Sequence, residues 1–180
     1  MKKLVILAGL PGVGKSYTAR ILEKKIKNSF YFDSDLFSKN YIETNEINFM
    51  ELSDKQKLSF RKQIHLKKMI SVLKTFENRK IVFLDTCFDI PSSRLEFHKL
   101  VPKISLIIVK ILAKDDTVKK RILQNEHDPR IIGNKQTRWN TYLNMKKNWR
   151  KIEKIDFHLD SDKYYPDQIK NLITYIEKYK

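Results

Sequence analysis

Three of the chain's four glycines fall within six residues, directly before a lysine and a serine. The stretch from Gly9 to Ser16, GLPGVGKS, fits the Walker A pattern G-x-x-x-x-G-K-[ST]. Glycines leave room for the backbone to curl around an anion and to adopt conformations that a Cβ forbids. Successive N–H groups and the start of the following helix then point at the phosphate. The spacing predicts a loop that binds a nucleoside triphosphate.

Each residue type in this loop has an expected task. Lys15 is expected to reach the β- and γ-phosphates, and Ser16 to hold Mg²⁺. The residues expected to contact the nucleotide are Gly9, Pro11, Gly12, Val13, Gly14, Lys15, Ser16 and Tyr17. An ordinary glycine turn is the alternative. It is disfavoured because a buried-strand pattern, KLVILA, precedes the loop and a helical pattern follows it.

Carboxylates end a second predicted strand, SFYFDSD (29–35). Phosphoryl transfer to a hydroxyl needs a group that accepts or orients the hydroxyl proton. Asp35 is expected to be that base, with Asp33 as the alternate or as a partner on the Mg²⁺ side; both are candidate acceptor contacts. A solvated turn in which either aspartate caps the next helix is the open alternative.

A third predicted strand, RKIVFLDTCF (79–88), delivers Asp85 after four apolar residues. This layout is typical of a buried strand that presents one acid toward Mg²⁺. Asp85 could instead bind the acceptor, or be a plain polar strand end. Arg94, in DIPSSRLEF, opens the next predicted helix, where its guanidinium could bind a substrate anion or simply be exposed.

A segment of about residues 121–138 is expected to form a lid. Arg121 and Arg130 lie along it. A mobile arginine can neutralise the charge that develops during phosphoryl transfer, and a closing segment excludes water. Arg121 is expected to contact the nucleotide and Arg130 the substrate, although a solvated basic helix face is the alternative. Trp139 and Tyr142 are expected to pack in the core rather than to stack on a base.

The elements that position these residues alternate between strands and helices, which predicts an α/β fold with a parallel five-stranded sheet covered by helices on both faces. In such sheets ligands bind at the carboxyl ends of the strands, where the motifs above lie. The remaining predicted strands are 105–113 and 154–161. The predicted helices are 16–27, 54–76, 92–101, 115–125, 135–152 and 166–179, with Ser53 and Gln56 as a capping box.

Composition limits the class of protein. The 180 residues are most simply one domain, 1–180. The net charge of +16 favours a polyanionic partner such as nucleic acid, or else reflects a lysine-rich coding bias, because the lysines are scattered. No apolar run reaches the roughly 20 residues of a membrane span. Cys87 is the single cysteine, so an internal disulfide is impossible and a cytoplasmic location is expected.

Taken together, these motifs resemble the P-loop kinases of the polynucleotide 5′-hydroxyl kinase and zeta-toxin type. GLPGVGKS looks like the family phosphate loop, DSDLF like its acid pair, and FLDTCFDIPSSRLEF like the stretch that carries an acid and an arginine. The resemblance implies a P-loop NTPase fold, a three-layer sandwich like that of nucleoside kinases, with a helical lid. It places the general base on Asp35, the strand-end acid on Asp85, and the two arginines on Arg94 and Arg121.

The resemblance also has departures. Polynucleotide kinases usually carry an arginine where this chain has Ser38, and an asparagine where it has Cys87. We therefore expect an ATP- and Mg²⁺-dependent kinase acting on a hydroxyl, which could belong to a nucleic-acid 5′-end, a nucleoside or a small metabolite. A nucleoside monophosphate kinase-like enzyme and a non-catalytic nucleotide-binding module are the alternatives.

Overall fold

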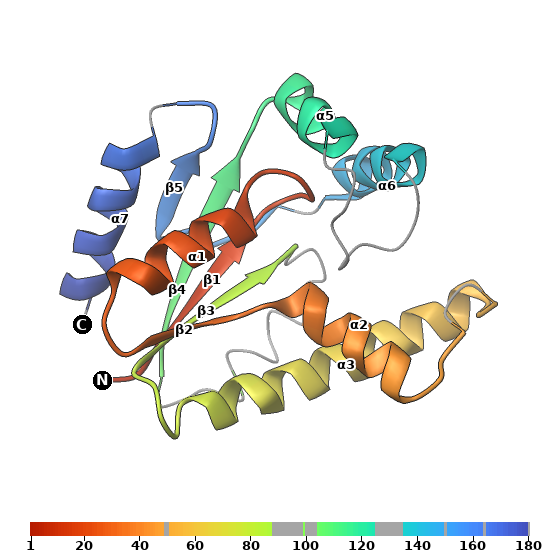
Figure 1. Cartoon of the computed structure of the whole chain (residues 1–180), viewed down its shortest axis with the longest axis horizontal. Coiled ribbons are helices and arrows are strands. Elements are labelled where there is room, and N and C mark those ends of the chain that lie inside the picture. Colours follow the sequence, from red (N-terminus) through yellow and green to blue (C-terminus); the bar gives the residue numbers. More distant parts are fainter. Residues whose placement is uncertain are drawn as a thin grey trace.

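The fold is built on one sheet. The structure, a computed structural model, describes residues 1–48, 51–87, 99, 104–124, 135–149, 151–163 and 165–179. Within these residues five strands pair in the order β2-β3-β1-β4-β5, and all four pairings are parallel (Figure 1). The strands are β1 (Lys3–Ala8), β2 (Ser29–Phe32), β3 (Ile81–Thr86), β4 (Ser105–Leu112) and β5 (Phe157–Asp160). The predicted parallel five-stranded sheet is therefore confirmed.

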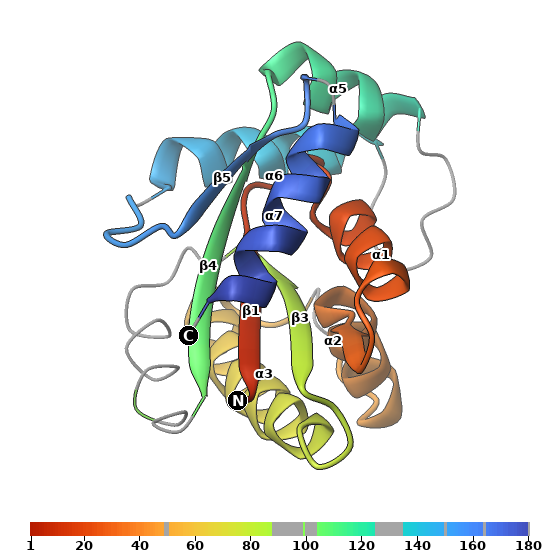
Figure 2. The same cartoon turned by 90° about the vertical axis from the view of Figure 1, so that its left-hand side faces the viewer.

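Helices cover both faces of this sheet, as predicted. Figure 2 shows α1 and α7 on one side of the strands and α3 on the other. Near the carboxyl ends of the strands lie α5 and α6, while α2 runs beside α3 (Figure 1). The described helices are α1 (Lys15–Lys25), α2 (Ser34–Thr44), α3 (Asp54–Thr75), α5 (Asp115–Gln124), α6 (Lys135–Asn148) and α7 (Tyr165–Lys178).

Alternation along the strands divides the apolar residues between two cores. In β1, Val5 and Leu7 pack with the helices of the α1 face, whereas Leu4 and Ile6 pack with α3. Because successive side chains of a strand point to opposite faces, the same rule applies along β3. Phe83 lies in the α1-side core, so Asp85, two residues later, projects to the α1 face. The alternation of side chains along β3 therefore directs Asp85 toward α1 and away from α3.

Three predicted strands are clearly shorter than expected: 79–88 contains β3 (Ile81–Thr86), 154–161 contains β5 (Phe157–Asp160), and 29–35 contains β2. The run 29–35 was predicted as strand throughout, but β2 ends at Phe32 and α2 begins at Ser34. Asp33 accepts a hydrogen bond from the Leu36 N–H at 3.0 Å and so caps this helix. Asp33 therefore caps α2, as the alternative expected, and its role as an acceptor contact stays a prediction. The helix that it opens is not among the predicted helices. By contrast, the predicted capping box of Ser53 and Gln56 at α3 is confirmed.

Several expectations fall outside the described residues. These are Arg94 and the helix 92–101, and Arg130 with the central part of the lid segment. Of the lid, the structure describes the end of α5, with Arg121, and the beginning of α6. No helix among the described residues combines the length and the apolar character that crossing a membrane requires.

Candidate functional site: a phosphate loop facing strand-end acids

The glycine-rich loop joins β1 to α1 at the carboxyl edge of the sheet. Gly12 and Gly14 have φ angles of 78° and 106°, in the left-handed region where residues with a Cβ are strained. Gly14 is also the N-cap of α1, which therefore begins at Lys15 without a side-chain cap. The N-terminal N–H groups of α1 and the positive end of its dipole consequently face the loop, the arrangement that favours a bound phosphate.

Tight packing fixes the base of the loop. A Cβ added at Gly9 would lie 2.7 Å from the Ile111 carbonyl oxygen of β4 and 2.8 Å from a methyl group of Val13. Lys15 turns back along the loop, and its Nζ donates to the Leu10 carbonyl oxygen at 2.9 Å. The lysine ammonium is thus held within the loop curve, where its charge adds to that of the helix dipole.

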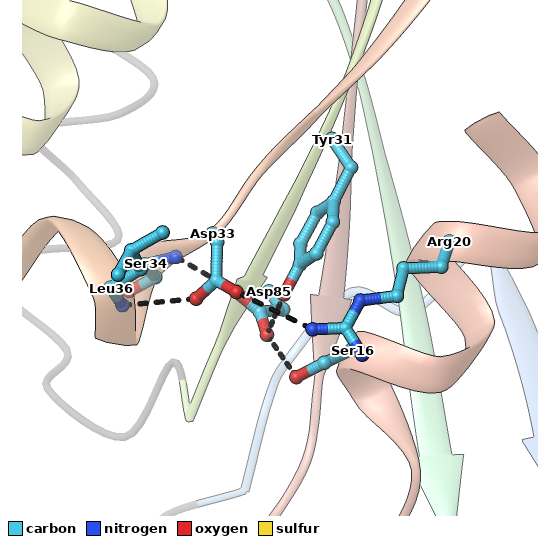
Figure 3. Close-up of polar contacts among 7 residues, drawn as sticks. All are labelled: Ser16, Arg20, Tyr31, Asp33, Ser34, Leu36 and Asp85. Atoms are coloured by element: carbon cyan, nitrogen blue, oxygen red, sulfur yellow. Dashed lines mark hydrogen bonds and ion pairs between the residues drawn. The ribbon is translucent and has the colours of Figure 1, made fainter. Parts of the chain in front are cut away.

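Asp85 is the point at which the loop meets the neighbouring strands (Figure 3). Its Oδ2 accepts from the Ser16 hydroxyl at 2.6 Å and from the Tyr31 hydroxyl at 2.8 Å. Its Oδ1 accepts from the Ser34 N–H at 3.1 Å. Asp85 is only 2% exposed, so a carboxylate there requires such donors. Three elements, α1, β2 and α2, are joined through this one side chain.

The two other acids lie at the start of α2. Asp33, besides capping that helix, lies 3.9 Å from the Arg20 guanidinium of α1 (Figure 3). Asp35 lies in the first turn of the helix. Its side chain reaches solvent, yet crowding by the protein raises the pKa of its carboxyl; desolvation is the largest cause and the negative charge of Asp85 the second. Lys15 and Lys68 partly oppose this shift.

Two further residues of the site lie on the side of α2. Burial and then the charge of Asp85 raise the pKa of the Tyr31 hydroxyl, so it remains a donor at physiological pH. Lys68 of α3 donates from Nζ to the Ser34 hydroxyl at 2.8 Å. Desolvation lowers the pKa of the Lys68 ammonium, although Asp35 and Asp85 favour its charge.

Arg121 of α5 lies on the opposite side of the loop. Its guanidinium donates to the Gly12 carbonyl oxygen at 3.3 Å and to the Ser161 hydroxyl at 2.9 Å. Tyr165, which bonds to the Thr18 hydroxyl, has its ring 5.9 Å from that of Tyr17. A guanidinium and two rings therefore border the loop on this side. Further from the loop, Trp139 stacks on the buried Tyr142, in agreement with the expected core packing.

The structure brings most of the predicted site residues to one edge of the sheet. Ser16 and Asp85 are bonded, and Asp35 is close enough to Lys15 and Asp85 to respond to their charges. Sequence reasoning missed Tyr31 and Lys68. Tyr31 reads as an ordinary strand residue, but it pairs with Phe83 and packs in the same core, so it lies on the α1 face to which Asp85 projects. Lys68 gives no local signal, because it reaches the site only through the packing of α3.

The donors around the loop suit a magnesium ion bound together with a nucleotide. The Ser16 hydroxyl proton is directed to Asp85, so the lone pairs of its oxygen remain available to a cation. Among the described residues, no group of three or more His, Cys, Asp or Glu side chains could hold a metal by itself. Mg²⁺ usually takes only one or two protein ligands and completes its shell with phosphate oxygens and water. The oxygen donors present fit that mode.

Comparisons with known proteins agree with this arrangement. The family model described as "AAA domain" matches residues 5–140. A search of curated protein sequences finds no significant match. The P-loop kinase fold is shared with solved structures at low sequence identity. Mycobacterium tuberculosis APS kinase, in complex with AMPPNP and APS, has a TM-score of 0.66 at 16% identity, covering 98% of each chain.

Two other solved kinases are similar to this chain over nearly their whole length. A sugar kinase from Janibacter sp. HTCC2649 has a TM-score of 0.63 at 14% identity, covering 99% of this chain and 96% of that one. A gluconokinase from Sinorhizobium meliloti 1021 has a TM-score of 0.56 at 12% identity, covering 99% of this chain and 98% of that one.

The packing of Gly9 generates a test of the loop. Gly9→Ala forces a Cβ against the backbone oxygen of Ile111, which cannot rotate away, so the base of the loop must shift. We expect the free energy of unfolding to fall by about 1–3 kcal/mol, the usual cost of overpacking, and triphosphate affinity to fall with it. Chemical denaturation and titration with a fluorescent ATP analogue measure the two effects. Unchanged stability and affinity would contradict the close packing.

Proposed function

This chain belongs to the AAA domain family, and we propose that it is a kinase that transfers the γ-phosphoryl group of ATP to a hydroxyl acceptor. The observation that carries the proposal is the bond between Ser16 of the phosphate loop and Asp85 of β3, with Asp35 beside them. A loop that binds phosphate is thereby placed next to a carboxylate suited to accept a proton.

The proposed roles follow from position. The loop N–H groups and Lys15 hold the β- and γ-phosphates, and Arg121 neutralises charge from the opposite side of the loop. Ser16 would hold Mg²⁺, and Asp85 would orient the Ser16 hydroxyl for this role. When bound, the ion would neutralise phosphate charge and align the γ-phosphoryl group. Asp35 accepts the proton as the acceptor oxygen bonds to the γ-phosphorus. The bond between that phosphorus and the bridging oxygen breaks, and ADP leaves.

The raised pKa of the Asp35 carboxyl supports this residue as the base. A carboxyl with a raised pKa is a better proton acceptor than an ordinary aspartate, provided that it is ionised at the working pH. Asp33 is less suited to this role, because one of its oxygens caps α2 and the other faces Arg20. Asp85 is less suited as well, since it already accepts three hydrogen bonds.

We further propose that the acceptor is a small hydroxyl compound. Similar structures include kinases whose names specify a sugar or gluconate, which supports a small hydroxyl compound. The resemblance to polynucleotide 5′-hydroxyl kinases and zeta toxins rests on the loop, on DSDLF and on the stretch FLDTCFDIPSSRLEF. Ser38 weakens this resemblance, because polynucleotide kinases usually carry an arginine at this position. The Ser38 hydroxyl instead donates to the Ser34 carbonyl oxygen of its own helix. We therefore favour a small hydroxyl compound over a nucleic-acid end.

A transfer assay tests this function directly. Purified protein is given γ-labelled ATP and Mg²⁺ with small hydroxyl compounds, nucleosides and oligonucleotides bearing a 5′-hydroxyl. We expect label on at least one hydroxyl compound, and a rate about 10²- to 10⁴-fold lower in Asp35→Asn because the proton acceptor is lost. Lys15→Ala should abolish transfer, and the exposed Asp116→Asn should not change it. Label found only in water would contradict the kinase, and no release of label at all would favour a non-catalytic module. Equal transfer by Asp35→Asn would leave the kinase intact and remove Asp35 as its base.

The raised pKa of Asp35 generates a second prediction. The base must be ionised, so activity is lost as the pH falls through its pKa. Since desolvation by the surrounding protein and the charge of Asp85 raise this pKa above the ordinary 3.8, the acid limb of log(kcat/KM) should have its midpoint above 3.8. Below that midpoint the rate should fall about tenfold per pH unit. The pH profile of the wild-type protein, compared with Asp35→Asn, checks this; an identical acid limb in both proteins would remove Asp35 from the reaction.

A further inference from the structure

Lys68 is a cation placed at the acceptor side of the site by the packing of a distant helix. Its neighbour Met69 and the next-turn residue Val72 are buried against the sheet at 1% exposure each, so α3 is fixed at this level. The Lys68 side chain is half-buried, and its Nζ lies 2.8 Å from the hydroxyl of Ser34, itself only 5% exposed. The ammonium is therefore held at the start of α2, beside the proposed base.

The charge of Lys68 is incompletely compensated by its neighbours. Desolvation outweighs the attraction of Asp35 and Asp85 and lowers the pKa of the ammonium. No ion pair within 4.0 Å joins Lys68 to Asp35, although both residues are described. The oxygens of Asp85 already accept three hydrogen bonds. The one hydrogen-bond acceptor of the Lys68 ammonium among the described residues is thus the neutral hydroxyl of Ser34.

An ammonium has three donors, and after the bond to Ser34 two of them have no acceptor within the part of the chain that the structure describes, so a ligand can use them. A partly dehydrated cation gains most from an anion, because a charge-assisted hydrogen bond restores the solvation that burial removed. Asp35 at the same place repels an anion but accepts from a hydroxyl. The pair therefore suits a compound that carries a hydroxyl group, to face Asp35, and a separate anionic group, to face Lys68.

We propose that Lys68 binds an anionic group of the acceptor, so that the site selects hydroxyl compounds bearing a carboxylate, sulfate or phosphate over their neutral counterparts. This inference rests on the proposed kinase function, whose acceptor class it specifies. Lys68 acts on acceptor binding, and the phosphate loop and Asp35 remain responsible for the transfer itself.

Binding measurements with matched pairs of compounds test this inference. The protein, saturated with Mg²⁺ and a non-hydrolysable ATP analogue, is titrated calorimetrically with glycerol against glycerol 3-phosphate, glycerol against glycerate, and glucose against gluconate. We expect the anionic member of at least one pair to bind about 10- to 100-fold more tightly, as a charge-assisted hydrogen bond implies. In Lys68→Met this preference should disappear, while binding of the ATP analogue is unchanged. Lys68→Arg should retain most of it.

The neighbouring lysine provides the matched control. Lys67 is exposed on the same turn of α3, so Lys67→Met changes the net charge equally and should keep the preference. Equal binding within every pair, or a preference that persists in Lys68→Met, overturns the inference. That failure is distinguishable from failure of the kinase proposal: transfer of label to neutral and anionic compounds at similar rates would leave the kinase intact and remove the role of Lys68.

Discussion

The buried carboxylate of Asp85 is the constraint on which the site depends. Moving an aspartate into the sheet edge costs free energy unless donors satisfy it, and here Ser16, Tyr31 and the Ser34 N–H do so. These donors belong to α1, β2 and α2. Satisfying one charge therefore fixes the start of the helix after the phosphate loop, the end of a neighbouring strand and the helix that carries Asp35.

Asp35 and Lys68 lie at the same edge of the sheet, and each only partly stabilises the charge of the other. The pKa of Asp35 is raised and that of Lys68 is lowered, and in both cases desolvation by the surrounding protein is the largest cause. Charges that their neighbours compensate only in part are typical of sites where a ligand supplies the missing partner. The acceptor and the nucleotide together would bring the hydroxyl, phosphate oxygens and cation that these side chains lack.

The sequence predicted the sheet, the described helices other than α2, and the loop because their signals are local. A Walker A pattern, alternating strands and the Ser53–Gln56 capping box are each readable within a few residues. The early end of β2 was missed because Asp33 and Asp35 looked like a continuation of the strand, although an aspartate before Leu36 and Phe37 is also a helix start. Lys68 could not be found from the sequence, because it lies 34 residues after Ser34. The two side chains meet only when α3 packs on the sheet.

The proposed function depends on a loop that binds a triphosphate while Asp85 holds Ser16 in place. The most direct measurement is a crystal structure with Mg²⁺ and a non-hydrolysable ATP analogue. The account predicts the β- and γ-phosphates within the curve from Gly9 to Ser16, the Ser16 hydroxyl about 2.0–2.1 Å from Mg²⁺ while still bonded to Asp85, and Asp35 facing the γ-phosphate. A nucleotide bound elsewhere, or a Ser16 that turns away from the metal, would contradict it.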